Sequence, residues 1–330
     1  MENVVNKERA SSTVSFRRFR PSDYEVYREF CIRTFGEYSY QKKKSYVDWL
    51  YGDCLEGFAV AVSDDTIVGM EHNFKAPIFI KDTPKLATVL HDLMVEDNHK
   101  GSVGFRLMYE SLRSDRYLVL PGSIGRLSRT YGRLGSTKFE SFWYRRFQMP
   151  TGVFKKVSKL KWVELTELAE RQSLLLGHNK EDSVNFREKA LKPFQKLRYF
   201  PEYLDWRFFH KDAPLTFYLS DFSGENTVLF TIGKRGRLPF ARIFYIRQQD
   251  ESIYKKIVKL VHRISARVGV PVILHSSFES APPRRLGYKA YKDSPVSYVY
   301  AQSREEDSSP TVPTFCSDIG FDGLDLLADA

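Results

Sequence analysis

A predicted strand passes into a predicted helix through the segment Asp92-Leu93-Met94-Val95-Glu96-Asp97-Asn98-His99-Lys100-Gly101-Ser102-Val103-Gly104. The strand ends in alternating apolar residues, and the turn that follows is basic and contains glycine. The free N–H groups at a helix N-terminus, with the helix dipole behind them, bind phosphate oxygens. Glycine lets the backbone approach a phosphate closely. The segment therefore predicts a site for a phosphate-bearing ligand.

The residues on either side of this segment predict a mixed α/β unit. Apolar residues recur at helical spacing in 24–35 and 104–113, which predicts two helices. Apolar runs predict strands at 16–20, 58–62, 66–70, 74–80, 86–95, 117–120 and 139–147, with a turn at Asp64-Asp65 and a stop at Pro121-Gly122. The front of the unit is therefore mostly antiparallel, and a strand–helix–strand unit follows it.

The chain carries a second copy of this pattern. Two motifs recur in the same order, Tyr46-Val47-Asp48-Trp49-Leu50-Tyr51 as Tyr203-Leu204-Asp205-Trp206-Arg207-Phe208, and Arg133-Leu134-Gly135 as Arg285-Leu286-Gly287. The tryptophans are 157 residues apart and the final glycines 152 residues apart, so the spacing nearly agrees. Because the Asp-Trp pair occurs in both copies, we expect it to be a packing anchor.

The second copy predicts the same class of fold as the first. It shows strand patterns at 217–219, 228–232, 241–246, 270–275 and 296–300, and a long amphipathic helix at 253–268. We therefore predict an α/β protein of two tandem domains, each a mostly antiparallel mixed sheet flanked by helices. The predicted domains are 14–149 and 158–302, with the boundary in 148–159 and an acidic, flexible tail at 303–330.

The composition excludes several classes of protein. Of the 330 residues 42% are hydrophobic, enough for a large core, yet no stretch approaches the roughly 18 unbroken apolar residues of a membrane span. The polar start at 1–13 lacks a secretory pattern. Cys31, Cys54 and Cys316 lie far apart, so we expect no disulfide framework, no metal site and a cytoplasmic location.

The charge of the chain is unevenly distributed. The net charge is +10, but from Ser303 onward one basic residue stands against seven acids, so the preceding body carries +16. A basic body favours an anionic partner, such as a phosphate-bearing cofactor, nucleic acid or an anionic membrane surface. A solvated surface rich in lysine is the alternative. The basic segments 16–20 and 126–130 also fit a phosphate clamp or an edge strand, so we do not expect nucleic acid to be the partner.

The segment 92–104 resembles the acyl-CoA pyrophosphate loop of the GNAT acetyltransferase superfamily, and the match extends over residues 14–147. The family pattern is Arg/Gln-x-x-Gly-x-Gly/Ala, whereas this chain has His99, Ser102 and Gly104 there and a glycine one place early, at Gly101. A plain turn between strand and helix is the alternative. The resemblance implies acetyl-CoA or another acyl-CoA as co-substrate, bound by Leu93, Met94, Val95, His99, Lys100, Gly101, Ser102, Val103 and Gly104.

The segment Tyr131-Gly132-Arg133-Leu134-Gly135 resembles the Tyr-x-x-x-Gly motif of the same family. The resemblance implies that Tyr131 lies beside the thiol sulfur and protonates it as it leaves. A phenol suits this step because its ordinary pKa, about 10, allows donation to a thiolate. The resemblance also implies that backbone N–H groups near Met94 and Val95 polarise the thioester carbonyl.

The base that deprotonates the amine has two candidates on the preceding strand, His91 and Asp92. Successive side chains on a strand point to opposite faces, so only one of them can face the substrate. The ordinary pKa of histidine, near 6.5, suits a base at neutral pH. A hydrogen-bonded histidine of the core is the alternative interpretation of His91.

The second copy departs from the family pattern. Its corresponding loop, Arg247-Gln248-Gln249-Asp250-Glu251-Ser252, has no glycine, and its two acids would repel a pyrophosphate. Pro283 stands where the first copy has Tyr131. We therefore interpret this half as catalytically inactive, which resembles tandem GNAT proteins with one degenerate half.

These patterns predict an acyl-CoA-dependent N-acyltransferase, with acetyl as the favoured group. We expect the acceptor to be a primary amine, on a small molecule of amino sugar or amino acid type, with polyamines and protein lysines also open. Aromatic residues weakly favour a flat or sugar-like acceptor: Trp143, Tyr144, Phe208 and Phe209. Two alternatives remain, a non-enzymatic tandem-GNAT binding protein and an acyltransferase whose donor is an acidic acyl carrier protein.

Overall fold

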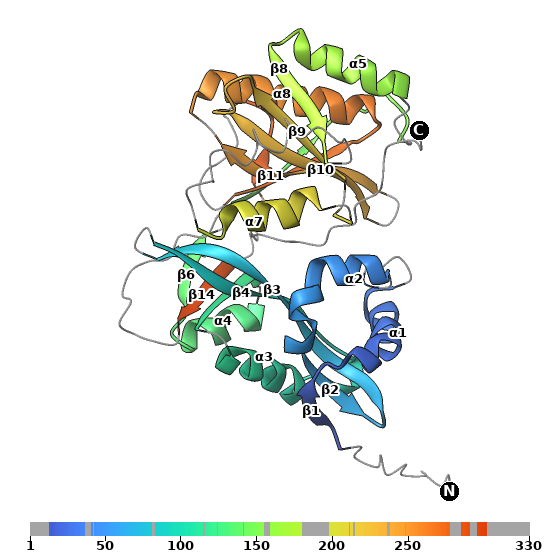
Figure 1. Cartoon of the computed structure of the whole chain (residues 1–330), viewed down its shortest axis with the longest axis vertical. Helices are drawn as coiled ribbons and strands as arrows, with labels where there is room; N and C mark the ends of the chain where they lie inside the picture. Colours follow the sequence, from blue (N-terminus) through green and yellow to red (C-terminus); the bar gives the residue numbers. More distant parts are fainter. Residues whose placement is uncertain are drawn as a thin grey trace, which may run out of the picture.

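The chain forms two seven-stranded sheets with helices packed on them (Figure 1). The computed structural model describes residues 13–36, 41, 43–80, 83–114, 116–123, 125–140, 142–154, 159–179, 198–210, 212–213, 215–235, 238–247, 249–277, 285–290 and 296–301. The predicted acidic tail, 303–330, and the predicted counterpart of Tyr131, Pro283, lie outside these residues. In the described part of the chain, no helix combines the length and apolar composition of a membrane span.

The first sheet has the strand order β1-β2-β3-β4-β5-β14-β6. Neighbouring strands run antiparallel except β4 and β5, which are parallel. The strands are β1 (Ser15–Arg18), β2 (Ala59–Ser63), β3 (Thr66–Ile80), β4 (Thr83–Val95), β5 (Tyr117–Ser123), β14 (Val296–Ala301) and β6 (Thr137–Glu140).

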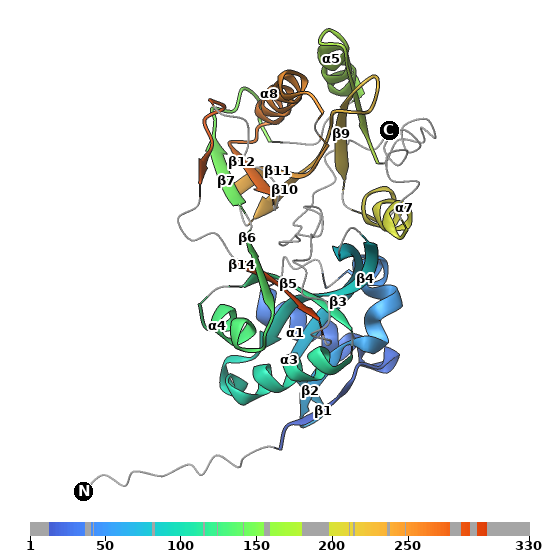
Figure 2. The same ribbon diagram turned by 90° about the vertical axis from the view of Figure 1, so that its left-hand side faces the viewer.

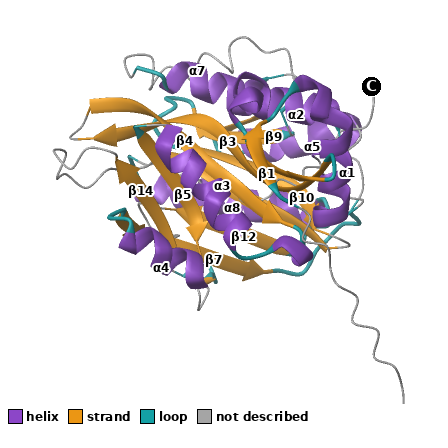
Figure 3. Cartoon of the chain, turned by 90° about the horizontal axis from the view of Figure 1, so that it is seen from below, coloured by secondary structure: helices purple, strands orange, loops and turns teal. Residues whose placement is uncertain are grey.

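Helices pack on both faces of the first sheet (Figure 3). One face carries α1 (Tyr24–Phe35) and α2 (Lys44–Tyr51), which share a core with Phe74 of β3. The other face carries α3 (Ser102–Ser114) and α4 (Gly125–Arg133). Short helical turns connect these elements: η1 (Pro21–Asp23), η3 (Gly52–Gly57) and η4 (Asp97–His99).

The second sheet has the strand order β13-β7-β12-β11-β10-β9-β8, with β11 and β12 parallel. The strands are β13 (Lys289–Ala290), β7 (Phe142–Phe147), β12 (Val272–Ser277), β11 (Leu238–Arg247), β10 (Thr227–Arg235), β9 (Thr216–Asp221) and β8 (Leu174–His178). One face carries α5 (Lys159–Glu170) and α8 (Glu251–Arg267). Between the two halves lie α7 (Phe200–Leu204) and the π-helical turn η6 (Asp205–Phe209) (Figure 1).

Most elements lie where the sequence predicts them, and the predicted class of fold is confirmed. The helix predicted at 24–35 is α1 itself, and the predicted turn has Asp64 and Asp65 at positive φ, 48° and 58°. Three expectations are wrong. The predicted strand 139–147 is two strands, β6 and β7, which lie in different sheets. The runs 66–70 and 74–80 form one strand, β3. Pro121-Gly122 does not end its strand, because β5 continues to Ser123, which pairs with Val296.

The two halves exchange a strand (Figure 2). β7 lies in the second sheet between β13 and β12, and β14 lies in the first sheet between β5 and β6. The sequence analysis placed 142–147 in the first domain and 296–300 in the second, so both placements are wrong. The copies are successive along the chain, whereas pairing depends on which edges meet in space, and each half completes the sheet of the other.

Candidate functional site

The parallel strands β4 and β5 separate part of the way along the first sheet. Their pairing is limited to Thr88 with Leu118 and Val89 with Val119, although β4 continues to Val95. Beyond Val89, β4 keeps its ladder with β3 on the other side. Alternate N–H and C=O groups of this part of β4 therefore point into the opening, where β5 does not pair with them.

A β-bulge interrupts β4 at Asp92. Leu93 pairs with Glu71 and His91 pairs with His72, which leaves Asp92 as the extra residue of the bulge, at a φ of 51°. Burial raises the pKa of the Cys31 thiol on α1 to about 12, and the charge of Asp92 adds to this rise. The charge of Asp92 is therefore felt on the face of the sheet that carries α1. The side chain of His91 lies outside the described part of the structure.

The loop after β4 leads directly into the start of α3. Gly101 immediately precedes the helix at a φ of 107°, a conformation that favours glycine. The first turn of α3 contains no acidic residue. The ammonium of Lys100 lies 2.5 Å from the carboxylate of Asp97, and both side chains are exposed. Because the first N–H groups of a helix lack partners within it, this helix end can accept an anion.

The other residues predicted to bind the acyl donor lie on β4 and in the turn that follows it. Leu93 and Val95 pack partly buried towards α3, and Met94 packs against the core on the α1 face. Gly104 lies close to β4, since an added Cβ there would approach Val95 at 3.5 Å. The Nδ1 atom of His99 is buried and has no hydrogen-bond partner among the described residues.

In the corresponding helix of the second half, α8, a side chain of the protein caps the N-terminus. The carboxylate of Asp250 accepts hydrogen bonds from the backbone N–H groups of Ser252 (2.7 Å) and Ile253 (2.9 Å). The side-chain oxygen of Asn226 accepts two more, from Gln249 (2.9 Å) and Asp250 (2.8 Å). A carboxylate therefore occupies the position that a phosphate would need.

Tyr131 lies over the place where β4 and β5 separate. It is 5% exposed in an apolar cluster that also contains Leu90 of β4 and Leu120 of β5. Its ring packs 5.8 Å from that of Tyr298 of β14, measured between centroids. Burial raises the pKa of the phenol, and the charge of Glu71 adds to the rise, so Tyr131 is protonated at neutral pH.

Glu71 is a functional candidate that the sequence analysis missed. It lies on β3 beneath α3, is 1% exposed, and its Oε2 atom has no hydrogen-bond partner among the described residues. Burial raises its pKa to about 7, an effect that the neighbouring hydroxyl of Ser111 on α3 partly offsets. A buried carboxyl that titrates near neutral pH is typical of functional sites. The polar triplet 71–73 inside an apolar strand was the available signal.

The aromatic residues expected near an acceptor are not brought together as a group. Phe208 is buried in the core between the halves and Phe209 packs against that core. Tyr144 lies in the second sheet, with its ring 6.2 Å from that of His275. The side chain of Trp143 lies outside the described part of the structure.

Comparison with solved structures places this fold among known proteins, although no family model and no curated protein matches the sequence. A GCN5-related N-acetyltransferase from Anabaena variabilis superposes with a TM-score of 0.55 at 12% identity, over 87% of this chain and 72% of that one. One from Kribbella flavida gives a TM-score of 0.53 at 14% identity, over 88% and 72%.

A third similar structure is a tandem GNAT protein from the clavulanic acid biosynthesis pathway. Its TM-score is 0.53 at 10% identity, over 88% of this chain and 98% of that one. At these identities the comparisons establish the architecture. The chain therefore has the fold of the GCN5-related N-acetyltransferases, built as two mixed sheets flanked by helices.

Proposed function

We propose that the first half binds an acyl-CoA, and that the protein is an N-acyltransferase that transfers the acyl group, acetyl in the simplest case, to a primary amine. One observation carries this proposal. The helix after the separated strand β4 has no acidic residue in its first turn, whereas the matching helix α8 is capped by Asp250. Of these two described helix ends, that of α3 therefore offers N–H groups to a pyrophosphate and that of α8 does not.

The proposed reaction is a direct attack. The amine nitrogen bonds to the thioester carbonyl carbon, the C–S bond breaks, and the sulfur leaves as a thiolate. Unpaired N–H groups of β4 near Met94 and Val95 polarise the carbonyl as negative charge develops on its oxygen. Tyr131 donates its proton to the thiolate. Asp92, at the bulge, and His91 are the candidates to take the proton that the amine loses.

Binding of the donor tests this function directly. Acetyl-CoA and CoA should each raise the free energy of unfolding, by about 2.7 kcal/mol at about 100 times the dissociation constant. The double substitution Gly101→Val and Gly104→Val places side chains at the helix end and should abolish this stabilisation. Gly224, in the turn between β9 and β10, also has a positive φ of 76°. Gly224→Val therefore controls for backbone strain and should keep the ligand effect.

Two results would overturn the proposal. Retained CoA binding in the Gly101 and Gly104 variant would remove the loop from the donor site. A wild-type chain that binds neither CoA nor acetyl-CoA would favour a non-enzymatic binding protein.

The net charge of the chain, +10, favours an alternative acyl donor. Acyl carrier proteins are acidic, so a basic surface would attract one. Transfer from an acyl carrier protein in an assay that excludes free CoA, with no transfer from acyl-CoA, would select this alternative.

A further inference from the structure

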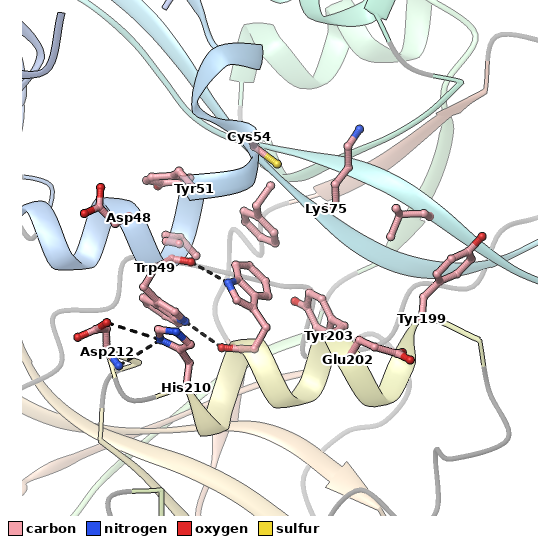
Figure 4. A pocket seen from close by; sticks show the side chains of 15 residues that line it. Asp48, Trp49, Tyr51, Cys54, Lys75, Tyr199, Glu202, Tyr203, His210 and Asp212 are labelled. Carbon is pink, nitrogen blue, oxygen red and sulfur yellow. Dashed lines mark hydrogen bonds and ion pairs between the residues drawn. The ribbon is translucent and has the colours of Figure 1, made fainter. Parts of the chain in front are cut away.

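A cavity of about 710 Å³ lies between the two halves of the molecule (Figure 4). The first half contributes residues of α2, η3, β3 and β4, and the second contributes residues around α7 and η6. This volume is within the range of small-molecule sites. The described lining contains none of the residues that we place in acyl transfer. The cavity is therefore a second site, separate from the donor site.

Aromatic rings line this cavity, and they are fixed in place. Six aromatic side chains contribute: Trp49, Tyr51, Phe74, Tyr199, Tyr203 and Trp206. The indole N–H groups of Trp49 and Trp206 both donate to backbone carbonyls. The ring of Trp206 also packs on those of Phe74 and Tyr203, at centroid distances of 6.0 Å and 5.6 Å. The wall is therefore formed before a ligand arrives, which lowers the cost of binding one.

A buried cation lies against two of these rings. Arg207 of η6 is 2% exposed, and its guanidinium carbon lies 5.2 Å from the ring centroid of Trp49 and 5.9 Å from that of Phe74. Arg207 itself is not part of the cavity lining. Because the two rings already hold one cation, they attract a second cation from the cavity only weakly.

The charged groups around the cavity offset one another. Among the described residues, three carboxylates line it, and three cations line it or contact its lining: Asp48, Glu202 and Asp212, and Lys44, Lys75 and Arg207. The ammonium of Lys44 lies 2.5 Å from the carboxylate of Asp48. The imidazole of His210 lies 3.8 Å from the carboxylate of Asp212. An ionic ligand would therefore lose its water without gaining an equivalent partner, whatever its sign.

We propose that this cavity binds an uncharged, planar, apolar molecule between the two halves. Its planarity follows from the wall, because aromatic rings prefer offset-stacked or edge-to-face contacts with another ring. Its lack of charge follows from the balanced charges of the lining and from the cation already held by Trp49 and Phe74. Such a ligand buries apolar surface of both halves at once. The binding site does not depend on the proposed acyltransferase function.

Four probes test the chemistry of the ligand by isothermal titration calorimetry on the full chain. The compounds 2-naphthylmethanol, 2-naphthylmethylamine and 2-naphthoate share a flat body and differ in charge, whereas 1-octanol is uncharged and flexible. We expect 2-naphthylmethanol to bind about tenfold or more tightly than either ion. Its affinity should not depend on salt.

Three results would overturn the proposal. An ion that binds as tightly as 2-naphthylmethanol would exclude an uncharged ligand. Tighter binding of 1-octanol would exclude a planar one. A chain that binds none of the four probes would exclude the site itself.

The thiol of Cys54 reports where the probe binds. Cys54 lines the cavity and is partly exposed, whereas Cys31 is buried in the core (Figure 4). Iodoacetamide should therefore alkylate Cys54 more slowly at saturating 2-naphthylmethanol, as followed by mass spectrometry of the peptide that contains it. An unchanged rate of alkylation at saturation would show that the probe binds elsewhere and would overturn the assignment.

A pair of variants tests the same location. Cys54→Trp adds a bulky ring at the cavity wall and should weaken 2-naphthylmethanol binding by about tenfold or more. Val163→Trp, at a 50% exposed position of α5, is the matched control and should keep wild-type affinity. Equal affinities in the two variants would overturn the assignment. If Cys54→Trp does not unfold cooperatively like the wild type, the alkylation of Cys54 in the wild type decides.

The Gly101→Val and Gly104→Val variant separates this site from the donor site. It should lose CoA and bind 2-naphthylmethanol with wild-type affinity, because neither glycine lines the cavity. Loss of both ligands in this variant, or competition between CoA and 2-naphthylmethanol in the wild type, would contradict a separate second site.

Discussion

Trp49 and Trp206 each donate the indole N–H to the backbone carbonyl of the other, at 2.8 Å and 2.7 Å. The ring centroids are 6.1 Å apart. An arrangement in which residue i contacts j as j contacts i is typical of an interface between two copies related by a two-fold axis. The two Asp-Trp motifs are therefore packing anchors, as the sequence predicts, and they anchor the halves to each other.

The first prediction concerns this pair of tryptophans. Trp206→Phe keeps a ring but removes one donor and leaves the carbonyl of Trp49 without its partner. We expect the free energy of unfolding to fall by about 1–3 kcal/mol, as measured by denaturant titration. Trp162→Phe is the control, since that indole packs on α5 against His178 and Phe217. An equal loss in both variants would show that the reciprocal bonds add nothing to the stability.

The second prediction concerns the proton donor. Tyr131→Phe removes one hydroxyl from a buried ring, so the affinity for CoA should not change. Turnover should fall about 100-fold to 10,000-fold, the usual cost of losing a general acid. Tyr298→Phe removes the hydroxyl of the neighbouring ring and should retain wild-type turnover. Full turnover by the Tyr131 variant would exclude a catalytic role and favour a purely packing function.

The third prediction follows from the raised pKa of Glu71, about 7 against an ordinary 4.5. The folded state holds this proton up to neutral pH, whereas the unfolded state releases it above pH 4.5. The carboxyl therefore contributes stability below pH 4.5 that is lost as the pH rises through 7, to a total of about 3 kcal/mol. Glu71→Gln should match the wild type at pH 4.5 and exceed its unfolding free energy at pH 8. If the unfolding free energies of Glu71→Gln and of the wild type change with pH in parallel, this would contradict the burial of the carboxyl.

The fourth prediction concerns the second half, where we expect stability to fall as the pH drops rather than as it rises. His262 bonds Tyr288 at 2.9 Å and His275 bonds Tyr254 at 3.3 Å. Burial, helped by the charge of Arg146, lowers the pKa of His262 to about 3, and burial lowers that of His275 to about 4. Both rings stay neutral in the fold and gain protons when the chain unfolds. Stability should therefore fall as the pH drops below 6.5, by about 1.4 kcal/mol per pH unit for each ring.

This slope can be measured by denaturant unfolding between pH 6.5 and pH 4.5. The double variant His262→Gln and His275→Gln should show a flatter slope than the wild type. The control is His210→Gln, because the side chain of His210 is 39% exposed to solvent. A wild-type slope in the double variant would mean that the two rings do not remain neutral in the fold.

Local patterns predicted local structure well. The apolar spacing of 24–35 and the turn at Asp64-Asp65 required only the neighbouring residues, and both are confirmed. The acids at the start of α8 are also visible in the sequence, from which we expected only that they repel a pyrophosphate. The structure adds that Asp250 caps this helix.

Long-range features could not be predicted in the same way. Glu71, His72 and Asn73 resemble a break between two strands, because burying such a triplet needs partners that are distant in the sequence. Here His72 bonds the hydroxyl of Tyr27 at 3.0 Å and stacks on Tyr51, while Glu71 contacts Ser111. The cavity between the halves, whose lining includes Trp49 and Trp206, likewise combines residues from both halves, so no single segment indicates it.

The strand exchange also constrains the order in which the protein can be completed during synthesis. Among the described strands, β6 pairs in the first sheet with β14, which lies more than 150 residues later in the sequence. A ribosome releases the chain from its N-terminus onwards, so the first sheet keeps an unpaired edge at β5 until β14 has emerged. Such an edge can pair with another nascent chain. The packing of Tyr298 against Tyr131 therefore forms only after the second half has emerged.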